Sequence, residues 1–178
     1  MTRADYAICG AVAMSAHGAE RYTRDIDVLV AAASIEPVVA ALARTMRELG
    51  REPEHGPAYQ IKLRSKRATT TAGVDIDLMV PVDAVEAWAL SNTVRAKAFD
   101  RKVDVASVEA LVLMKLRAYL SDPETAVGAK HRTDAFTLLE LGRADVAALR
   151  QFVRSDAAMA TELDRMLRAP RPRGRRPE

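Results

Sequence analysis

The chain has 178 residues, 49% of them hydrophobic, and a formal net charge of +3. This length predicts one domain with a hydrophobic core and is too short for two ordinary domains. The single cysteine, Cys9, excludes an internal disulfide, and no apolar run approaches the roughly 20 residues of a membrane span. The first residues carry no basic region followed by an apolar run, so we expect a cytoplasmic protein without membrane contact.

The positive charge is concentrated in residues 168–178, which hold five arginines and one glutamate. The rest of the chain is therefore nearly neutral. Proline and arginine with almost nothing apolar predict a disordered tail, which either contacts RNA, DNA or an acidic partner or is simply solvated. Outside the tail, one compact basic run can follow a phosphate backbone or form a solvated hairpin. It consists of Lys62, Arg64, Lys66 and Arg67.

Strands and helices alternate in the first part of the chain. We expect strands at residues 6–9, 24–30, 59–63 and 74–80. Residues 11–18 predict a short helix, at whose end His17 is expected to hydrogen-bond the last carbonyl groups. A second helix is predicted by apolar residues at helical spacing, with Ser34 as its cap and Gly50 at its end.

Helices dominate after Pro81. We expect them at residues 83–90, 108–120, 130–141 and 145–168, with Ser107 as the cap of the second and a short extended piece around 103–105. This order predicts an α+β fold, a small mixed sheet flanked by helices with a helical C-terminal portion. We divide the chain into a sheet core (1–81), a helical portion packed on the same domain (82–167) and the tail (168–178).

Two acidic pairs carry the candidate chemistry. Asp25 and Asp27 are two residues apart on a predicted strand, so both carboxylates point to the same face. Such like charges repel unless one is protonated or a cation binds. Asp75 and Asp77 repeat the arrangement on a second strand, and three carboxylates from neighbouring strands can hold two Mg²⁺ ions with positions open for phosphate oxygens. The pattern predicts phosphoryl or nucleotidyl transfer.

The residues around these pairs resemble the nucleotidyltransferase superfamily related to DNA polymerase β. The likeness rests on Gly10-Ala11, on Asp25 and Asp27 after a gap of thirteen residues, and on a later Asp in an apolar strand. The strings GAVAMSAHGAERYTRDIDVLV, SVEALVLMKLRAYL and KHRTDAFTLLELG are similar to small bacterial AbiEii-type or minimal nucleotidyltransferases, over roughly residues 6–142. The resemblance implies a nucleotidyltransferase fold and an enzyme that uses an NTP and releases pyrophosphate.

The resemblance also implies roles for residues of the first acidic strand and the turn before it. Gly10 and Ala11 match the turn whose backbone N–H groups approach the triphosphate, although the superfamily usually has Gly or Ser at the position of Ala11. A turn that enters a helix N-terminus attracts phosphate through its backbone donors. Asp25 and Asp27 match two ligands of the catalytic metals, for which two Mg²⁺ ions are expected.

The third carboxylate comes from the second acidic strand. We expect Asp77 to bind the catalytic metal and to help deprotonate the acceptor hydroxyl, because the apolar residues 78–80 follow it as in the family's strand. Asp75 is then a neighbour of the site or an alternative ligand.

Several cations are candidates for nucleotide binding. Arg21 can hold a phosphate by paired hydrogen bonds or pair with surface acids. Lys115 lies among apolar residues of its predicted helix, so it either extends to solvent or reaches the nucleotide, as the resemblance implies. Lys130 can contact phosphate, and Asp134 can orient Lys115 or Arg132. Ordinary ion pairing on the helix surface is the alternative.

The sequence leaves the acceptor open. The AbiEii resemblance implies an RNA such as tRNA, or a protein hydroxyl, in a toxin–antitoxin or phage-defence setting with a cognate antitoxin or toxin protein as partner. One alternative is transfer to a small molecule, as in aminoglycoside nucleotidyltransferases. Another is a noncatalytic regulator or antitoxin of the same fold that binds a nucleotide or a partner protein.

Overall fold

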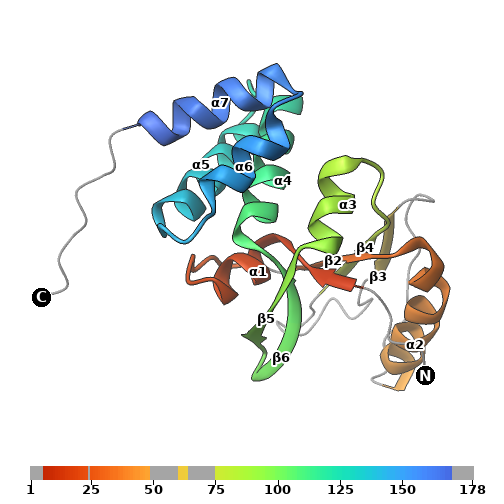
Figure 1. The fold of residues 1–178 in the computed structure, drawn as a ribbon. Coiled ribbons are helices and arrows are strands. Elements are labelled where there is room, and N and C mark those ends of the chain that lie inside the picture. Colours follow the sequence, from red (N-terminus) through yellow and green to blue (C-terminus); the bar gives the residue numbers. More distant parts are fainter. Residues whose placement is uncertain (1–5, 24, 49–59, 64–74, 170–178) are drawn as a thin grey trace, which may run out of the picture. The chain divides into compact units, whose positions relative to one another are not determined.

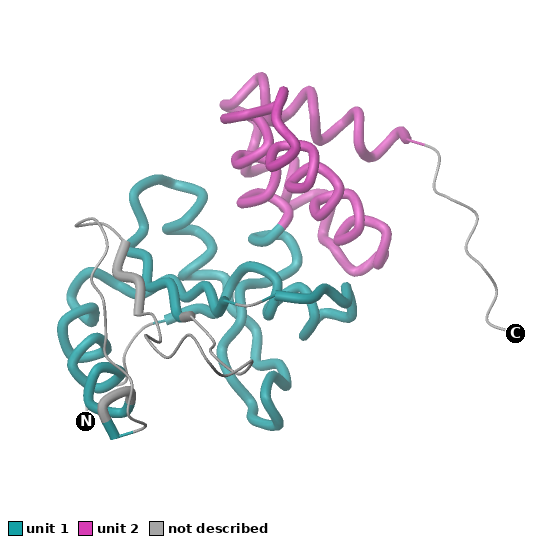
Figure 2. The backbone as a smooth tube through the Cα atoms, turned by 180° about the vertical axis from the view of Figure 1, so that it is seen from behind, with its two compact units in different colours: residues 1–111 teal, residues 112–178 magenta. Residues whose placement is uncertain are grey.

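A computed structural model describes residues 6–23, 25–48, 60–63 and 75–169 (Figure 1). The chain divides into two compact units, residues 1–111 and 112–178 (Figure 2). No helix within the described ranges is both long and apolar enough to cross a bilayer. The predicted tail beyond Ala169 and most of the predicted basic run lie outside the described residues, and the predicted boundary after Pro81 stays a prediction.

The described part of the first unit contains a six-stranded mixed sheet with the order β3-β4-β2-β1-β6-β5. In this sheet β2 is antiparallel to β1 and parallel to β4. The outer strands β3 and β5 are antiparallel to β4 and β6, and β1 is parallel to β6. The predicted α+β fold with a small mixed sheet is confirmed. The strands are β1 (Tyr6–Ile8), β2 (Asp25–Val30), β3 (Gln60–Leu63), β4 (Asp75–Met79), β5 (Thr93–Ala98) and β6 (Arg101–Ala106).

The two faces of the central strands differ in chemistry. On one face, Val30 and Leu78 form a buried cluster with neighbouring apolar residues, among them Val38 and Leu42 of helix α2 (Ile35–Glu48). Asp25 and Asp27 of β2 and Asp77 of β4 occupy the alternate positions, which point to the opposite face. Packing of α2 on the apolar face therefore directs the carboxylates away from this core.

Helix α1 (Gly10–Ala16) joins β1 to β2 and buries Ala11, Ala13 and Met14. The backbone N–H of His17 caps the helix at the carbonyl oxygens of Ala13 and Met14. The imidazole of His17 instead lies 2.8 Å, through Nε2, from the carbonyl oxygen of Ala106 on β6. This side chain therefore ties the end of α1 to the sheet, a contact that the sequence analysis did not anticipate.

Strands β5 and β6 form a hairpin that the sequence analysis missed, except for an extended piece near Val103. The two central residues of its turn, Phe99 and Asp100, have φ values of 49° and 59°. These left-handed values are those of a two-residue type I′ turn, which usually contains Asn or Gly. The usual sequence signal of a hairpin is therefore absent here.

Two helices begin at a residue whose side chain caps them, and one of these caps, Ser107, was predicted. Asp83 caps α3 (Ala84–Ser91) by accepting the N–H of Glu86 at 2.9 Å. Ser107 caps α4 (Val108–Ser121) by accepting the N–H of Ala110 at 3.2 Å, as predicted. A side-chain oxygen at this position satisfies an N–H group that has no partner within the helix.

Two predicted boundaries in the second unit are wrong. Helix α5 (Ala126–Glu140) begins four residues before Lys130, because Thr125 caps it through the N–H of Gly128. The single helix expected over 145–168 is two helices, α6 (Val146–Val153) and α7 (Ala157–Arg168). Asp156 separates them, because its carboxylate accepts the N–H of Met159 and so starts a new helix.

Candidate metal and nucleotide site

Strand pairing brings the two predicted acidic pairs together. In the parallel pair β2·β4, Asp25 lies opposite Asp75 and Asp27 lies opposite Asp77. Directly paired residues share a face, so the side chains of Asp27 and Asp77 are neighbours. One carboxylate oxygen from each of Asp25, Asp27 and Asp77 lies within 4.8 Å of the other two. The fold thus gathers three carboxylates at one point of the sheet.

This cluster has the donor set and spacing of a magnesium site. Mg²⁺ prefers oxygen ligands at about 2.0–2.1 Å, so two ligands of one ion lie at most about 4.2 Å apart. The three carboxylates need only small rotamer changes to reach that spacing from within 4.8 Å. Like charges at this separation repel, and a bound divalent cation relieves the repulsion. Asp25, Asp27 and Asp77 therefore fit a divalent cation.

The three carboxylates differ in their surroundings. Asp77 is only 8% exposed and lies next to the buried Leu78. Asp25 stands at the exposed beginning of β2, where the hydroxyl of Thr23 donates a hydrogen bond to its carboxylate. Thr23 thereby restricts the rotamer of Asp25, a role that the sequence analysis did not assign to it. A Thr two residues before an acid is the local signal that indicates such a bond.

Gly10 is the residue of the turn that the geometry constrains most strongly. Its φ is +59°, and a Cβ atom built on it would lie 1.8 Å from Oδ2 of Asp27. The backbone N–H of Cys9 also donates to the carbonyl oxygen of Asp27 at 2.8 Å. The start of α1 therefore lies against Asp27, and only a glycine leaves room for that carboxylate.

Other predicted site residues of the first unit have different positions. Ala11 is 7% exposed, so only its backbone is suited to contact a phosphate. Arg21 follows α1 and is partly buried, and together with Thr23 it lines an open groove of about 410 Å³. The backbone of Asp75 lies opposite Asp25, but its side chain is not among those described.

Lys115 in the second unit has an acidic partner. Its Nζ lies 3.3 Å from Oδ2 of Asp134, and the two side chains are 14% and 9% exposed. Of the predicted options for Asp134, pairing with Lys115 is the one observed. Lys130, by contrast, is exposed on α5. The roles of Lys115 and Lys130 in nucleotide binding stay predictions.

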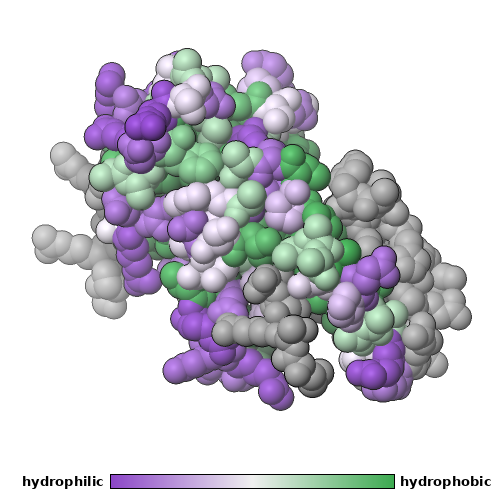
Figure 3. Space-filling view, turned by 45° about the vertical axis from the view of Figure 1, so that its right-hand side comes forward, coloured by the Kyte–Doolittle hydropathy of each residue, from purple (hydrophilic) through white to green (hydrophobic). Residues whose placement is uncertain are grey.

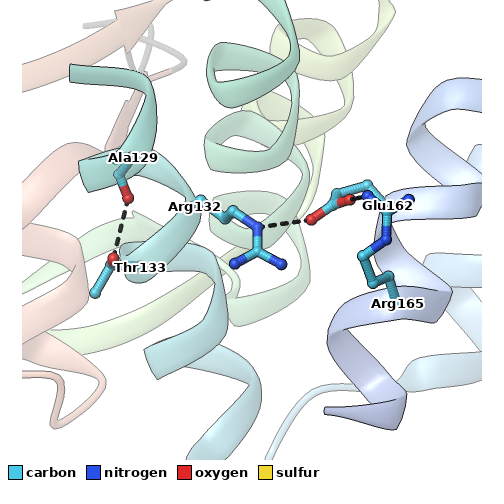
Figure 4. Close-up of polar contacts among 5 residues, drawn as sticks. All are labelled: Ala129, Arg132, Thr133, Glu162 and Arg165. Carbon is cyan, nitrogen blue, oxygen red and sulfur yellow. Dashed lines mark hydrogen bonds and ion pairs between the residues drawn. The ribbon is translucent and has the colours of Figure 1, made fainter. Parts of the chain in front are cut away.

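Arg132 joins helix α5 to helix α7 (Figure 4). Its Nε lies 2.8 Å from Oε1 of Glu162, whose side chain is 3% exposed, and Arg165 pairs with the other oxygen of the same carboxylate. The hydrogen bond from Arg132 to Glu162 raises the pKa of Arg132, against the opposing effect of burial. These contacts are within the second unit and give Arg132 a structural role.

Comparison with solved structures supports a nucleotidyltransferase fold. An antigenic nucleotidyltransferase-like protein from Paracoccidioides brasiliensis is 16% identical, with a TM-score of 0.52 over 90% of this chain and 84% of that chain. The antibiotic-resistance factor ANT(2'')-Ia is 17% identical, with a TM-score of 0.53 over 91% of this chain and 88% of that chain. The crystal structure of ANT(2")-Ia in complex with adenylyl-2"-tobramycin is 19% identical in sequence, with a TM-score of 0.54 over 85% of this chain and 88% of that chain. No curated relative matches the chain.

The sequence places the chain within one family of this class. The family model described as nucleotidyl transferase AbiEii toxin, type IV toxin–antitoxin system, matches residues 3–176. The chain therefore belongs to the AbiEii nucleotidyltransferase toxin family and is a nucleotidyltransferase. The predicted resemblance is confirmed over nearly the whole chain.

Proposed function

We propose that the chain transfers a nucleoside monophosphate from an NTP to a hydroxyl group of an RNA or protein, as the toxin of a toxin–antitoxin pair with a cognate antitoxin. The observation that supports this most strongly is the convergence of Asp25, Asp27 and Asp77 within 4.8 Å beside the start of α1. Family membership supports nucleotidyl transfer and the toxin–antitoxin setting.

In the proposed reaction, the acceptor oxygen forms a bond to the α-phosphorus of the NTP. The bond between the α-phosphorus and the oxygen bridging to the β-phosphorus breaks, and pyrophosphate leaves. Asp77 accepts the proton of the acceptor hydroxyl. It is suited to this because it is the most buried of the three carboxylates and lies directly across from Asp27.

Asp25, Asp27 and Asp77 are proposed to hold the divalent cations, two Mg²⁺ ions in the full complex. Bound there, the ions would supply stabilisation of the negative charge that develops on the transferring phosphate. The backbone N–H groups of Gly10 and Ala11 are proposed to approach the triphosphate. Arg21, Lys115 and Lys130 are the proposed cationic contacts of the nucleotide.

The test is label transfer. The protein is incubated with labelled NTPs, Mg²⁺ and total RNA or cell extract, in parallel with the double variant Asp25→Asn/Asp27→Asn. The exposed Glu124→Gln variant is the matched control, because it removes one acid outside the cluster. We expect transfer by the wild type and by Glu124→Gln, and loss of transfer in the double variant. Absence of both NTP and metal binding by the wild type would refute the proposal and favour a noncatalytic regulator.

A further inference from the structure

A groove beside the acidic cluster contains two aromatic residues and a lysine that have no role in the proposed reaction. It lies between α1, the residues that follow it and the end of the β5–β6 hairpin, and its volume is about 410 Å³. Its lining includes Ser15, Arg21, Tyr22, Thr23, Lys97 and Phe99. Thr23 connects the groove to the proposed metal site, because the same hydroxyl bonds the carboxylate of Asp25.

Two aromatic rings at this groove are unusually exposed. Tyr22 is 83% exposed and Phe99 is 62% exposed. Large apolar side chains left in water next to a concave surface commonly mark a binding site. Flat aromatic rings offer a stacking surface to any nucleobase, which makes them the usual contact for unpaired bases.

The backbone at Phe99 is in an unusual conformation. Phe99 has φ of 49°, a left-handed conformation that is unfavourable for a residue with a large side chain. Gly or Asn would form the same turn with less strain. An exposed ring held at a strained position contributes little to folding, and such strain commonly accompanies a functional role.

The hairpin that presents Phe99 is also basic. Residues 93–106 contain four cations and two aspartates, for a net charge of +2. Lys97 pairs with Asp100 at 3.0 Å, and Arg95 pairs with Asp104 at 3.2 Å, whereas Arg101 and Lys102 are exposed at the end of β6 next to the turn. Hydrophilic surface gathers at the lower edge of Figure 3, where Figure 1 places the end of this hairpin.

We infer that this groove binds the unpaired end of a single-stranded RNA, whose last hydroxyl is the acceptor of the transfer. Tyr22 and Phe99 stack on its bases, and Lys97 and the other cations of the hairpin contact its phosphates. The inference rests on the proposed function and selects RNA as its acceptor.

The test measures RNA binding without any transfer reaction. A fluorescein-labelled single-stranded RNA of about 12 nucleotides is titrated with the full chain, without NTP, and followed by fluorescence anisotropy. We expect Phe99→Gly and Tyr22→Ala each to weaken binding by about 5- to 100-fold, the range for loss of one stacking ring. Lys97→Gln should reduce the slope of log affinity against log salt concentration by about 0.7.

The variants include their own control for folding. Phe99→Gly should keep or raise Tm, by about 2–4 °C, because glycine relieves the strain of the turn. Tyr22→Ala removes a ring that is 83% exposed and should leave Tm unchanged. Val127→Ala, at an exposed apolar residue of the second unit, should alter neither RNA affinity nor Tm.

Three outcomes would overturn the inference. The first is that the wild type binds no RNA, and the second is that Phe99→Gly and Tyr22→Ala both bind RNA with unchanged affinity. The third is that these two variants bind a fluorescent ATP analogue more weakly but bind RNA as the wild type does. The variant Asp25→Asn/Asp27→Asn should still bind RNA. A chain that binds RNA through Phe99 but transfers no label refutes the proposed function alone, whereas one that transfers label regardless of both rings refutes this inference alone.

Discussion

Gly10 and Asp27 are in such close contact that a methyl group on Gly10 would lie 1.8 Å from a carboxylate oxygen of Asp27. The two residues belong to the start of α1 and the middle of β2, so the contact joins the proposed phosphate-binding turn to the proposed metal site. The turn and the carboxylate are therefore placed as one structural element.

Gly10→Ala should lower both the stability and the metal affinity of the protein. The substitution places Ala at a φ of +59° and forces Asp27 to move. Gly142→Ala is the matched control, because its φ is +65° and nothing lies within 4 Å of the added Cβ. We expect urea denaturation to show that the free energy of unfolding falls by about 1 kcal/mol in Gly142→Ala and by more in Gly10→Ala.

Calorimetric titration with Mn²⁺ should show weaker metal binding for Gly10→Ala only. Equal effects of the two variants on metal binding would contradict this role of Gly10.

Asp77→Asn should abolish transfer and yet not destabilise the protein without metal. Removing one of three neighbouring negative charges relieves repulsion, so the Tm measured in EDTA should stay the same or rise. The increase in Tm on addition of Mg²⁺ should be lost, and label transfer should fall by at least about 100-fold. A large drop in Tm in EDTA would instead indicate that Asp77 has a structural role.

Variants of the pair Lys115–Asp134 distinguish a structural role of Lys115 from a role in nucleotide binding. Because both side chains are largely buried, Lys115→Met should lower the free energy of unfolding by about 3 kcal/mol by leaving Asp134 without this counter-charge. The double variant Lys115→Met/Asp134→Leu should recover most of that loss. If Lys115 also binds the nucleotide, the recovered protein keeps a raised KM for the NTP. A KM equal to that of the wild type would assign Lys115 to folding alone.

Glu162 should be one of the most important ionised groups for stability of the second unit. Glu162→Gln weakens two arginine contacts at a side chain that is 3% exposed, so we expect a loss of about 3 kcal/mol. Asp164→Asn is the control, since its pair with Arg150 is 41% and 60% exposed, and it should cost less than about 1 kcal/mol. Chemical denaturation of both variants measures the difference. Similar losses would show that burial does not strengthen the Glu162 contacts.

The effect of pH on the Arg132 contact follows from the sign of its pKa shift. The hydrogen bond to Glu162 raises the pKa of Arg132 above the ordinary value of a guanidinium group. A basic group whose pKa is higher in the folded state than in the unfolded state stabilises the folded state. This stabilisation is complete at pH values below the pKa of the unfolded state, and it is lost as the pH rises through the pKa of the folded state. The contribution of Arg132 should therefore be constant between about pH 6 and 9. Comparing urea denaturation of the wild type and Arg132→Met across that range tests this, and a difference that varies with pH would contradict it.

Local rules made much of this protein predictable from its sequence. Side chains alternate between the two faces of a strand, which predicted that Asp25 and Asp27 lie on the same face. Ser107, followed by apolar residues at helical spacing, predicted the start of a helix. The family motif added the turn at Gly10. These signals act over a few residues, so they do not depend on the rest of the fold.

Only the tertiary structure decided which distant residues meet. The parallel pairing of β2 with β4 places Asp77 beside Asp27 across fifty positions of sequence, and no local pattern specifies that register. Helix packing likewise pairs Asp134 with Lys115 and Arg132 with Glu162. The groove with Phe99 exists because a hairpin without the usual turn residues packs beside α1. Long-range packing overrides weak local preference, and it is this packing that places candidate RNA-binding residues beside the acidic cluster.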